Sequence, residues 1–190
     1  MKTKPPITRD ELTLAMQKGL RPKWAFFWGH TPSRDSSISK ACFSQWWNGH
    51  PFQLDGINYP TAEHCMMAEK ARLFGDKDRL SAILNAKSPA IAKRLGRQVV
   101  GFDDKIWLEH RWKIVVRANT AKFSQYPALK QFLVQTGERI IVEASPFDRI
   151  WGIGMAADHA DAERPQNWNG LNLLGFALME VRQQLAANDS

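Results

Sequence analysis

The sequence predicts a mainly helical protein with a few short β-strands, an α+β fold in a single compact domain. Most of the chain falls into capped or amphipathic helical segments, whereas apolar runs of strand length are few. For 190 residues one domain is the default, and a hydrophobic content of 44% suffices for an ordinary core. The sequence has no internal repeat and no low-complexity tract.

The first 22 residues are predicted to form an N-terminal extension to a main domain over residues 23–190. Residues 1–7 are interpreted as a loose leader. Thr8 begins a capping box that Glu11 completes, and Gly19 is a stop signal, so the extension contains one short helix. The run WAFFW at residues 24–28 then has the length and apolar character of a strand.

The stretch from residue 52 to residue 74 combines a hairpin with a helix. Asp55-Gly56 lies between short apolar runs, and this dipeptide favours a two-residue turn because both turn positions need a positive φ. Thr61 is a natural N-cap for the helix that follows. Glu63 and His64 therefore fall in the first turn, where the helix dipole favours an ionised carboxylate. Complementing that dipole is also the simplest structural explanation for Glu63.

Capping signals and apolar patterns predict the remaining elements. Ser88-Pro89 is an N-cap with proline at the first helical position, and Gly96 is expected to close this helix. Asp103 or Asp104 caps the longest helix, which is expected to be central because its apolar residues surround much of its circumference. Helices are expected over about 78–86, 89–96, 105–123, 127–137 and 171–185, and a strand over 139–143.

Two loops stand out by composition and length. The segment Thr31–Lys40 is rich in serine and is predicted to be a mobile surface loop. Residues 145–170 form an unusually long connection, and such loops are typically functional or disordered. Trp151 and Trp168 within it argue against simple disorder. Near Asn169-Gly170, the first turn of the last helix is predicted to offer free N–H groups to an anion.

The composition indicates an anionic partner and a reducing compartment. The net charge of +7 comes from 26 Lys and Arg against 19 Asp and Glu, which suits phosphate, nucleotide or nucleic acid, although a solvated basic surface explains it equally well. Only Cys42 and Cys65 are present, which disfavours a disulfide scaffold or a thiolate zinc site. Without an apolar leader or an eighteen-residue apolar run, a cytoplasmic protein without a membrane span is expected.

The residues with chemical potential are carboxylates and tryptophans. Familiar phosphate-loop, dinucleotide, zinc-protease and serine-hydrolase motifs are absent, and the five histidines have no metal-pair spacing, so no metal and no cofactor are predicted. Glu63 and Asp148, together with Trp107 and Trp151, suit cleavage of a bond to a flat base. Gly152 would allow a ligand to approach the backbone closely. A turn-capping aspartate and core tryptophans are the structural alternatives.

Several short motifs in order resemble the NADAR (YbiA-like) family, over about residues 26–185. The motifs are Phe43-Ser44 with the aromatic residues after it, Leu54-Asp55-Gly56, Tyr59-Pro60-Thr61-Ala62-Glu63-His64, Ser88-Pro89, Leu95-Gly96-Arg97, Trp107, Ala121-Lys122-Phe123, the run from Val142 to Gly154, Asn167-Trp168 and the run from Gly170 to Gly175. The segment Thr31–Lys40 and the N-terminal helix depart from the family pattern, near the expected entrance of the site.

The resemblance implies a mostly helical N-glycosidase. Riboflavin-linked members of the family act on phosphoribosylated aminopyrimidine intermediates, and other members are implied to remove ADP-ribose from a base nitrogen, notably of guanine, free or in nucleic acid. The functional positions of the family fall here on Glu63, Trp107, Asp148, Trp151 and Asn172. A nucleotide-binding module without catalysis is the alternative of another class, although two carboxylates would repel an anionic ligand.

We accordingly predict Glu63 and Asp148 as the catalytic residues. Their assignment as acid and base is left open, because it depends on their environments. The predicted substrate-binding residues are Ser44, Trp107, Trp151, Gly152 and Asn172.

Overall fold

The computed structural model describes residues 5–35 and 37–187, which separate into two compact units. The terminal unit comprises the described residues of Met1–Gly29 and Lys130–Ser190, and the central unit is His30–Leu129. The boundary at Leu129 falls within helix α6 (Pro127–Val134). Residues 1–4 of the expected leader and Ser36 of the expected surface loop lie outside the described residues.

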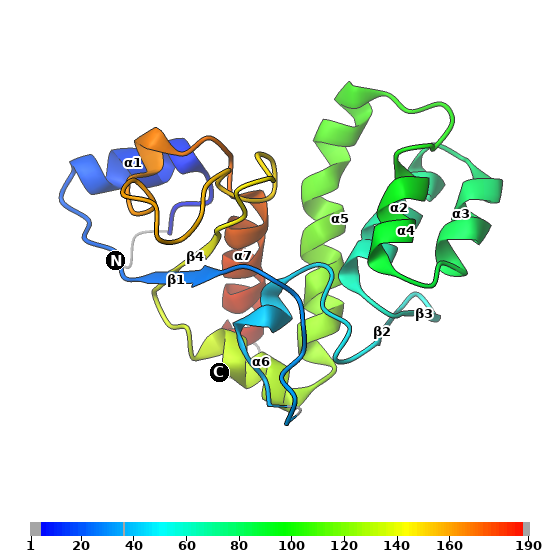
Figure 1. The fold of residues 1–190 in the computed structure, drawn as a ribbon, viewed down its shortest axis with the longest axis horizontal. Coiled ribbons are helices and arrows are strands. Elements are labelled where there is room, and N and C mark those ends of the chain that lie inside the picture. Colours follow the sequence, from blue (N-terminus) through cyan, green and yellow to red (C-terminus); the bar gives the residue numbers. More distant parts are fainter. Residues whose placement is uncertain (1–4, 36, 188–190) are drawn as a thin grey trace. The chain divides into compact units, whose positions relative to one another are not determined.

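The described residues contain seven α-helices, four short strands and two short 3₁₀ helices (Figure 1). The predicted mainly helical fold with a few short strands is therefore confirmed. No helix among these residues combines the length and the apolar character that a membrane span requires.

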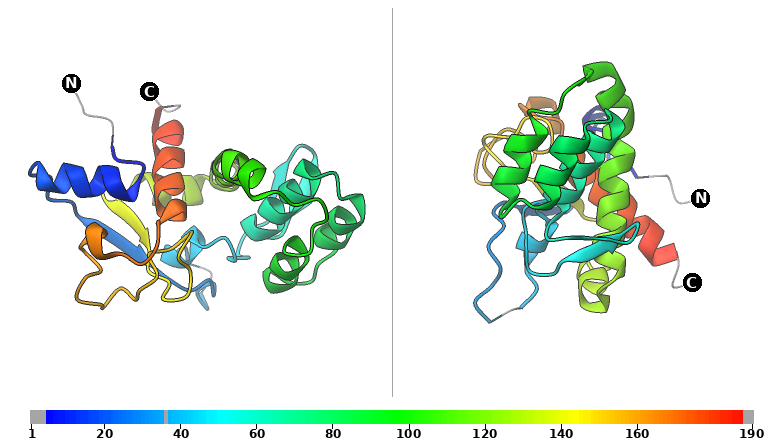
Figure 2. Two further views of the ribbon diagram at one scale, coloured as in Figure 1. Left: turned by 90° about the horizontal axis from the view of Figure 1, so that it is seen from above. Right: turned by 90° about the vertical axis from the view of Figure 1, so that its right-hand side faces the viewer.

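In the terminal unit, helix α7 (Leu173–Ala187) packs on a two-stranded parallel sheet (Figure 2). The sheet pairs β1 (Trp24–Phe27) with β4 (Ile140–Glu143), which confirms both strand predictions. Gly175 allows α7 to approach β4 closely, because a Cβ atom at this position would lie 2.1 Å from the carbonyl oxygen of Ile141.

Helix α1 (Arg9–Gln17) forms as predicted and is tied to the rest of the terminal unit. The hydroxyl of Thr8 accepts the N–H of Glu11 at 3.1 Å, and Gly19 follows the helix with a φ of 105°. The helix lies against the 3₁₀ helix η2 (Pro165–Asn167), and Arg9 donates to the carbonyl oxygen of Trp168 at 3.3 Å. The domain boundary after residue 22 stays a prediction.

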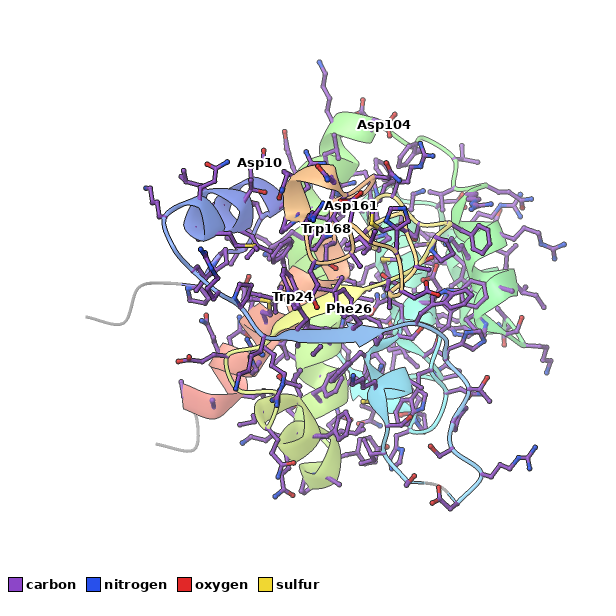
Figure 3. The ribbon with its side chains drawn as sticks, turned by 60° about the vertical axis from the view of Figure 1, so that its left-hand side comes forward. Asp10, Trp24, Phe26, Asp104, Asp161 and Trp168 are labelled. Carbon is purple, nitrogen blue, oxygen red and sulfur yellow. The ribbon has the colours of Figure 1, made fainter. Side chains whose placement is uncertain are left out.

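An aromatic cluster orders the long loop of the terminal unit. Trp24 is stacked on Phe26 with ring centroids 5.8 Å apart and is edge-on to Trp168 at 6.2 Å. These three residues are labelled in Figure 3. The indole N–H of Trp168 donates to the carbonyl oxygen of Ala162 at 2.8 Å. Internal contacts of this kind confirm that the loop is ordered rather than simply disordered.

The central unit is built around helix α2 (Ala62–Leu73). It packs against α3 (Lys77–Leu84), α4 (Pro89–Gly96) and α5 (Asp104–Ser124). The predicted hairpin precedes it, with β2 (Phe52–Leu54) antiparallel to β3 (Ile57–Tyr59). Asp55 and Gly56 have φ angles of 51° and 76°, as a two-residue turn of this type requires.

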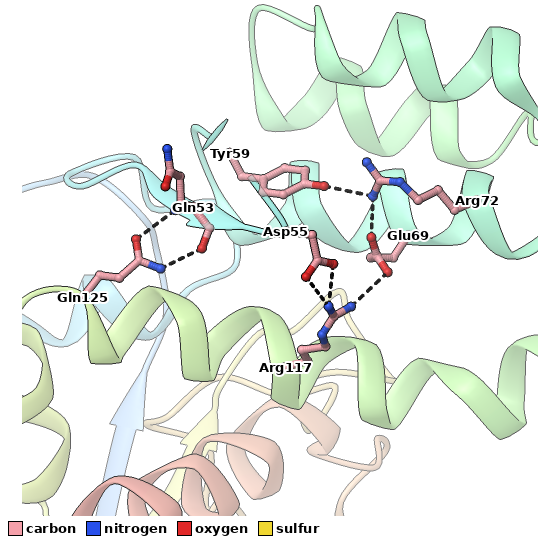
Figure 4. A network of polar contacts seen from close by, with 7 residues as sticks. All are labelled: Gln53, Asp55, Tyr59, Glu69, Arg72, Arg117 and Gln125. Atoms are coloured by element: carbon pink, nitrogen blue, oxygen red, sulfur yellow. Dashed lines mark hydrogen bonds and ion pairs between the residues drawn. The ribbon is translucent and has the colours of Figure 1, made fainter. Parts of the chain in front are cut away.

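A polar network fixes the hairpin on α2 and α5 (Figure 4). Arg117 of α5 pairs with Asp55 of the turn and, at 3.6 Å, with Glu69 of α2. Arg72 pairs with the same Glu69 and donates to the hydroxyl of Tyr59 at 2.9 Å. These contacts therefore fix the position of the hairpin relative to the start of α2.

Helix α4 ends at Gly96, as predicted, and a Cβ atom at this position would lie 2.0 Å from the Sδ atom of Met67. One detail of the predicted helices was wrong, since helix α6 ends at Val134 instead of Gly137. The predicted cap of α5 is correct, since Asp103 accepts the N–H groups of Lys105 and Ile106.

Helix α5 is buried along its second half only. Val115 and Phe123 are fully buried, whereas Ile106 and Leu108 near its start are 42% and 53% exposed. Its first half is thus less central than the apolar pattern predicted.

Both cysteines are buried free thiols in the central unit. Burial raises the pKa of Cys42 and of Cys65 to about 12, so neither is a thiolate at neutral pH. The described residues include no group of three or more His, Cys, Asp and Glu side chains that could hold a metal ion.

Candidate functional site

Glu63 is a buried carboxylate in the first turn of α2. Thr61 is the N-cap, and its hydroxyl accepts the N–H of His64 at 3.3 Å, as the sequence predicted. Glu63 is the second residue of the helix and only 2% exposed. A fully buried acidic residue is uncommon, and burial strengthens its electrostatic effect on any charge nearby.

The segment Ser44-Gln45 holds the backbone of Glu63. The N–H of Glu63 donates to the carbonyl oxygen of Gln45 at 2.9 Å. The side chain of Gln45 is itself fixed, because its Oε1 atom accepts from Asn119 at 2.9 Å and its Nε2 atom lies 3.9 Å from the Sδ atom of Met66. The first turn of α2 is therefore anchored to α5 through Gln45.

The buried side chain of Lys122 in α5 also holds the segment before Glu63 in place. Its Nζ atom is buried and donates to the carbonyl oxygens of Cys42 at 2.6 Å and Ser44 at 3.0 Å. Burial lowers the pKa of Lys122 to about 8. A neutral amine still has two N–H groups, so both bonds survive loss of the proton.

His64 has a structural role beside Glu63. Its Nδ1 atom lies 2.8 Å from the hydroxyl of Thr61, and its Nε2 atom lies 3.2 Å from the carbonyl oxygen of Ala86. Because a carbonyl only accepts, Nε2 carries the hydrogen and Nδ1 accepts from Thr61. Burial lowers the pKa of His64, which favours this neutral tautomer and leaves neither nitrogen free for proton transfer.

Trp107 lies one turn into α5 and is half-buried. Its backbone N–H donates to the carbonyl oxygen of Asp103 at 3.0 Å. The ammonium of Lys70 lies 5.5 Å from the centroid of the Trp107 ring. The central unit thus contains Ser44, Glu63 and Trp107 of the predicted site.

Asp148 organises a tight turn in the terminal unit. Its Oδ1 atom accepts the N–H groups of Ile150 at 2.9 Å and Trp151 at 2.8 Å. Its own N–H donates to the hydroxyl of Ser145 at 3.2 Å. The turn-capping role considered from the sequence is therefore present, and a catalytic role for Asp148 stays a prediction.

Gly152 and Asn172 contact the backbone of β4. A Cβ atom at Gly152 would lie 2.8 Å from the carbonyl oxygen of Glu143, so the close approach at Gly152 is to the chain itself. Asn172 is buried with a φ of 55°, accepts the N–H of Glu143 at 3.0 Å and donates to the carbonyl oxygen of Ile141 at 2.9 Å. Substrate binding by Gly152 and Asn172 stays a prediction.

The predicted anion site at the start of the last helix was wrong. The N–H groups of residues 171–174 donate in turn to the carbonyl oxygens of Arg149, Gly152, Ile150 and Trp151 at 3.0–3.2 Å. The tight turn that contains Trp151 therefore caps α7 through its backbone and uses the donors that an anion would need.

Sequence reasoning missed Gln45, Asn119 and Lys122 as supports of the site. Lys122 and its neighbours belong to the Ala-Lys-Phe motif on which the resemblance partly rested. Nothing in the local pattern indicates that a lysine in this helix is buried, because its acceptors lie 78 and 80 positions away.

The family model described as "NADAR domain" matches residues 26–186 and so spans both units. The chain belongs to the NADAR family. Among its relatives, N-glycosidase R617 of Acanthamoeba polyphaga mimivirus is 40% identical over 170 residues, which are 85% of this chain and 96% of that protein. The Zea mays protein named riboflavin biosynthesis protein PYRR, chloroplastic, is 34% identical over 138 residues, 69% of this chain and 20% of the maize protein.

A solved NADAR structure confirms the fold. The NMR structure of Escherichia coli YbiA matches with a TM-score of 0.68 and 29% identity, covering 90% of this chain and 89% of YbiA. YbiA of strain K12 is named an N-glycosidase and is 33% identical over 144 residues, 76% of this chain and 79% of YbiA. This NADAR protein is accordingly an enzyme of the N-glycosidase class.

Proposed function

We propose that the protein hydrolyses the ribosyl C–N bond of phosphoribosylated aminopyrimidine intermediates of riboflavin biosynthesis. The buried carboxylate of Glu63, anchored in the first turn of α2, carries this proposal. The maize relative, whose name places it in riboflavin biosynthesis, supports the choice of substrate.

The chemistry requires a negative group near the sugar carbon. As the C1–N bond breaks, its electron pair leaves with the base nitrogen, and C1 develops positive, oxocarbenium-like charge. Glu63 stabilises this charge and orients the water whose oxygen forms the new bond to C1. The proton lost by that water and the proton gained by the base nitrogen balance the reaction.

The other predicted residues have supporting roles in this proposal. Asp148 holds the ribose hydroxyls or acts as the second acid–base group. Trp107 and Trp151 are proposed to stack against the base, and Ser44, Gly152 and Asn172 stay predicted substrate-binding residues. The substrate is a small molecule, and nucleic acid is not required as a partner.

The experiment that tests the substrate measures release of free base by the purified protein. The phosphoribosylaminopyrimidine intermediate and an ADP-ribosylated guanine nucleoside are offered separately at equal concentration. Release from the first substrate supports the proposal. Release of base from the second substrate alone indicates that the protein reverses ADP-ribosylation. Binding of both substrates without release of base supports a non-catalytic binding module instead.

A further inference from the structure

Lys70 and Glu63 lie on the same face of α2. They are seven positions apart, which is almost two helical turns, so their side chains leave the helix on one side about 10 Å apart along its axis. Glu63 lies in the first turn, and Lys70 lies in the last turn. The face that carries the proposed catalytic carboxylate therefore also carries a cation.

Two aromatic rings lie close to the ammonium group of Lys70. Its Nζ atom lies 4.0 Å from the ring centroid of Phe102 and 5.5 Å from that of Trp107. Phe74, at the end of the same helix face, packs edge-on to Phe102 with centroids 5.3 Å apart. The cation is thus held beside Trp107, a residue predicted to bind substrate.

Among the residues that the structure describes, none accepts a hydrogen bond from the three N–H donors of this ammonium. Within the described part of the central unit, Lys70 contacts the two rings but forms no hydrogen bond or ion pair. Burial lowers the pKa of Lys70, the carboxylate of Asp104 partly opposes this effect, and the charge of Arg97 adds to it. A half-buried ammonium near a second cation is a favourable position for an anion.

We propose that Lys70 binds the phosphate on C5 of the ribosyl group that this enzyme cleaves, with Arg97 as a second cation. The proposal rests on the function proposed above, in which Glu63 acts at C1 of the same sugar. A ribose phosphate has its reacting carbon and its phosphate at opposite ends, as Glu63 and Lys70 are at opposite ends of one helix face. Phosphoribosyl and ADP-ribosyl substrates share this C5 phosphate.

Calorimetric titration with ribose 5-phosphate and with ribose tests the proposal without turnover. The wild-type protein is compared with Lys70→Met and with Lys77→Met, which removes an exposed lysine at the start of α3. We expect Lys70→Met to weaken binding of ribose 5-phosphate at least about tenfold and to leave ribose binding unchanged. Lys77→Met should bind both ligands as the wild-type protein does.

Substitutions that keep shape or charge guard against a folding defect. Lys70→Arg should retain part of the preference for ribose 5-phosphate, and Lys70→Gln should lose it while melting at the wild-type temperature. A folded Lys70→Met or Lys70→Gln protein that binds ribose 5-phosphate with wild-type affinity overturns the proposal. So does wild-type protein that binds ribose 5-phosphate no more tightly than ribose.

Binding and hydrolysis separate the two proposals. If Lys70 is required for ribose 5-phosphate binding but no base is released from either substrate, the phosphate site stands and the proposed reaction fails. If base is released and Lys70→Met leaves kcat/KM unchanged for the phosphorylated substrate, the reaction stands and the phosphate site fails.

Discussion

The N–H of Glu63 donates to the carbonyl oxygen of Gln45 at 2.9 Å, and this bond joins the first turn of α2 to a segment that α5 holds in place. Asn119 binds the side chain of Gln45, and Lys122 binds the carbonyl oxygen of Ser44 next to it. The position of the proposed catalytic carboxylate is therefore set by residues of another helix, and substitutions in α5 should affect it.

Asn119→Ala should reduce both stability and turnover. The substitution leaves the buried Oε1 atom of Gln45 without its donor, which costs about 1–3 kcal/mol of unfolding free energy. Because Gln45 supports Glu63, kcat should fall more than KM rises. Urea unfolding and steady-state kinetics measure the two effects, with Asn58→Ala on the exposed side of β3 as the control. Wild-type kcat in Asn119→Ala would show that Gln45 needs no such support.

Lys122 should give the protein a recognisable pH dependence of stability. Its pKa is about 8 in the folded state against an ordinary value of 10.5, so the unfolded state binds more protons between these pH values. The contribution of Lys122 to the free energy of unfolding therefore rises with pH. The cost of burying its charge is present below pH 8 and is lost toward pH 10.5. The unfolding free energy of the wild-type protein minus that of Lys122→Met should accordingly increase from pH 7.5 to pH 10. A difference that stays flat or falls over this range would mean that Lys122 keeps its proton when buried.

Gly175→Ala should destabilise the terminal unit. The added Cβ atom would lie 2.1 Å from the carbonyl oxygen of Ile141, so α7 and β4 must move apart, at a cost of about 1–3 kcal/mol. Thermal melting measures the effect, with Gln183→Ala on the exposed side of α7 as the control within about 0.5 kcal/mol of wild type. A melting temperature equal to that of wild type would contradict the close packing of α7 on β4.

Local signals account for the parts of the fold that could be predicted. The caps at Thr8, Thr61 and Asp103 and the turn at Asp55-Gly56 depend on residues a few positions apart, and the structure has each of them. Glu63 could be placed in a first turn for the same reason.

Long-range contacts account for the parts that could not be predicted. The parallel pairing of Trp24 with Ile140 and the bonds from Lys122 to Cys42 and Ser44 join distant parts of the sequence. The predicted anion site failed for this reason too, since the donors at the start of α7 are used by a turn some twenty residues earlier. A pattern of neighbouring residues does not show which distant carbonyl oxygen will accept a hydrogen bond from a given N–H group.

The central claim is that the buried carboxylate of Glu63 performs the N-glycosidase reaction, and single-turnover hydrolysis by Glu63→Gln tests it most directly. Asp78→Asn is the matched control, because Asp78 is also the second residue of its helix but is exposed. We predict that Glu63→Gln melts close to the wild-type temperature and releases base at least about 100-fold more slowly, while Asp78→Asn keeps the wild-type rate. A well-folded Glu63→Gln protein with the wild-type rate would contradict the claim.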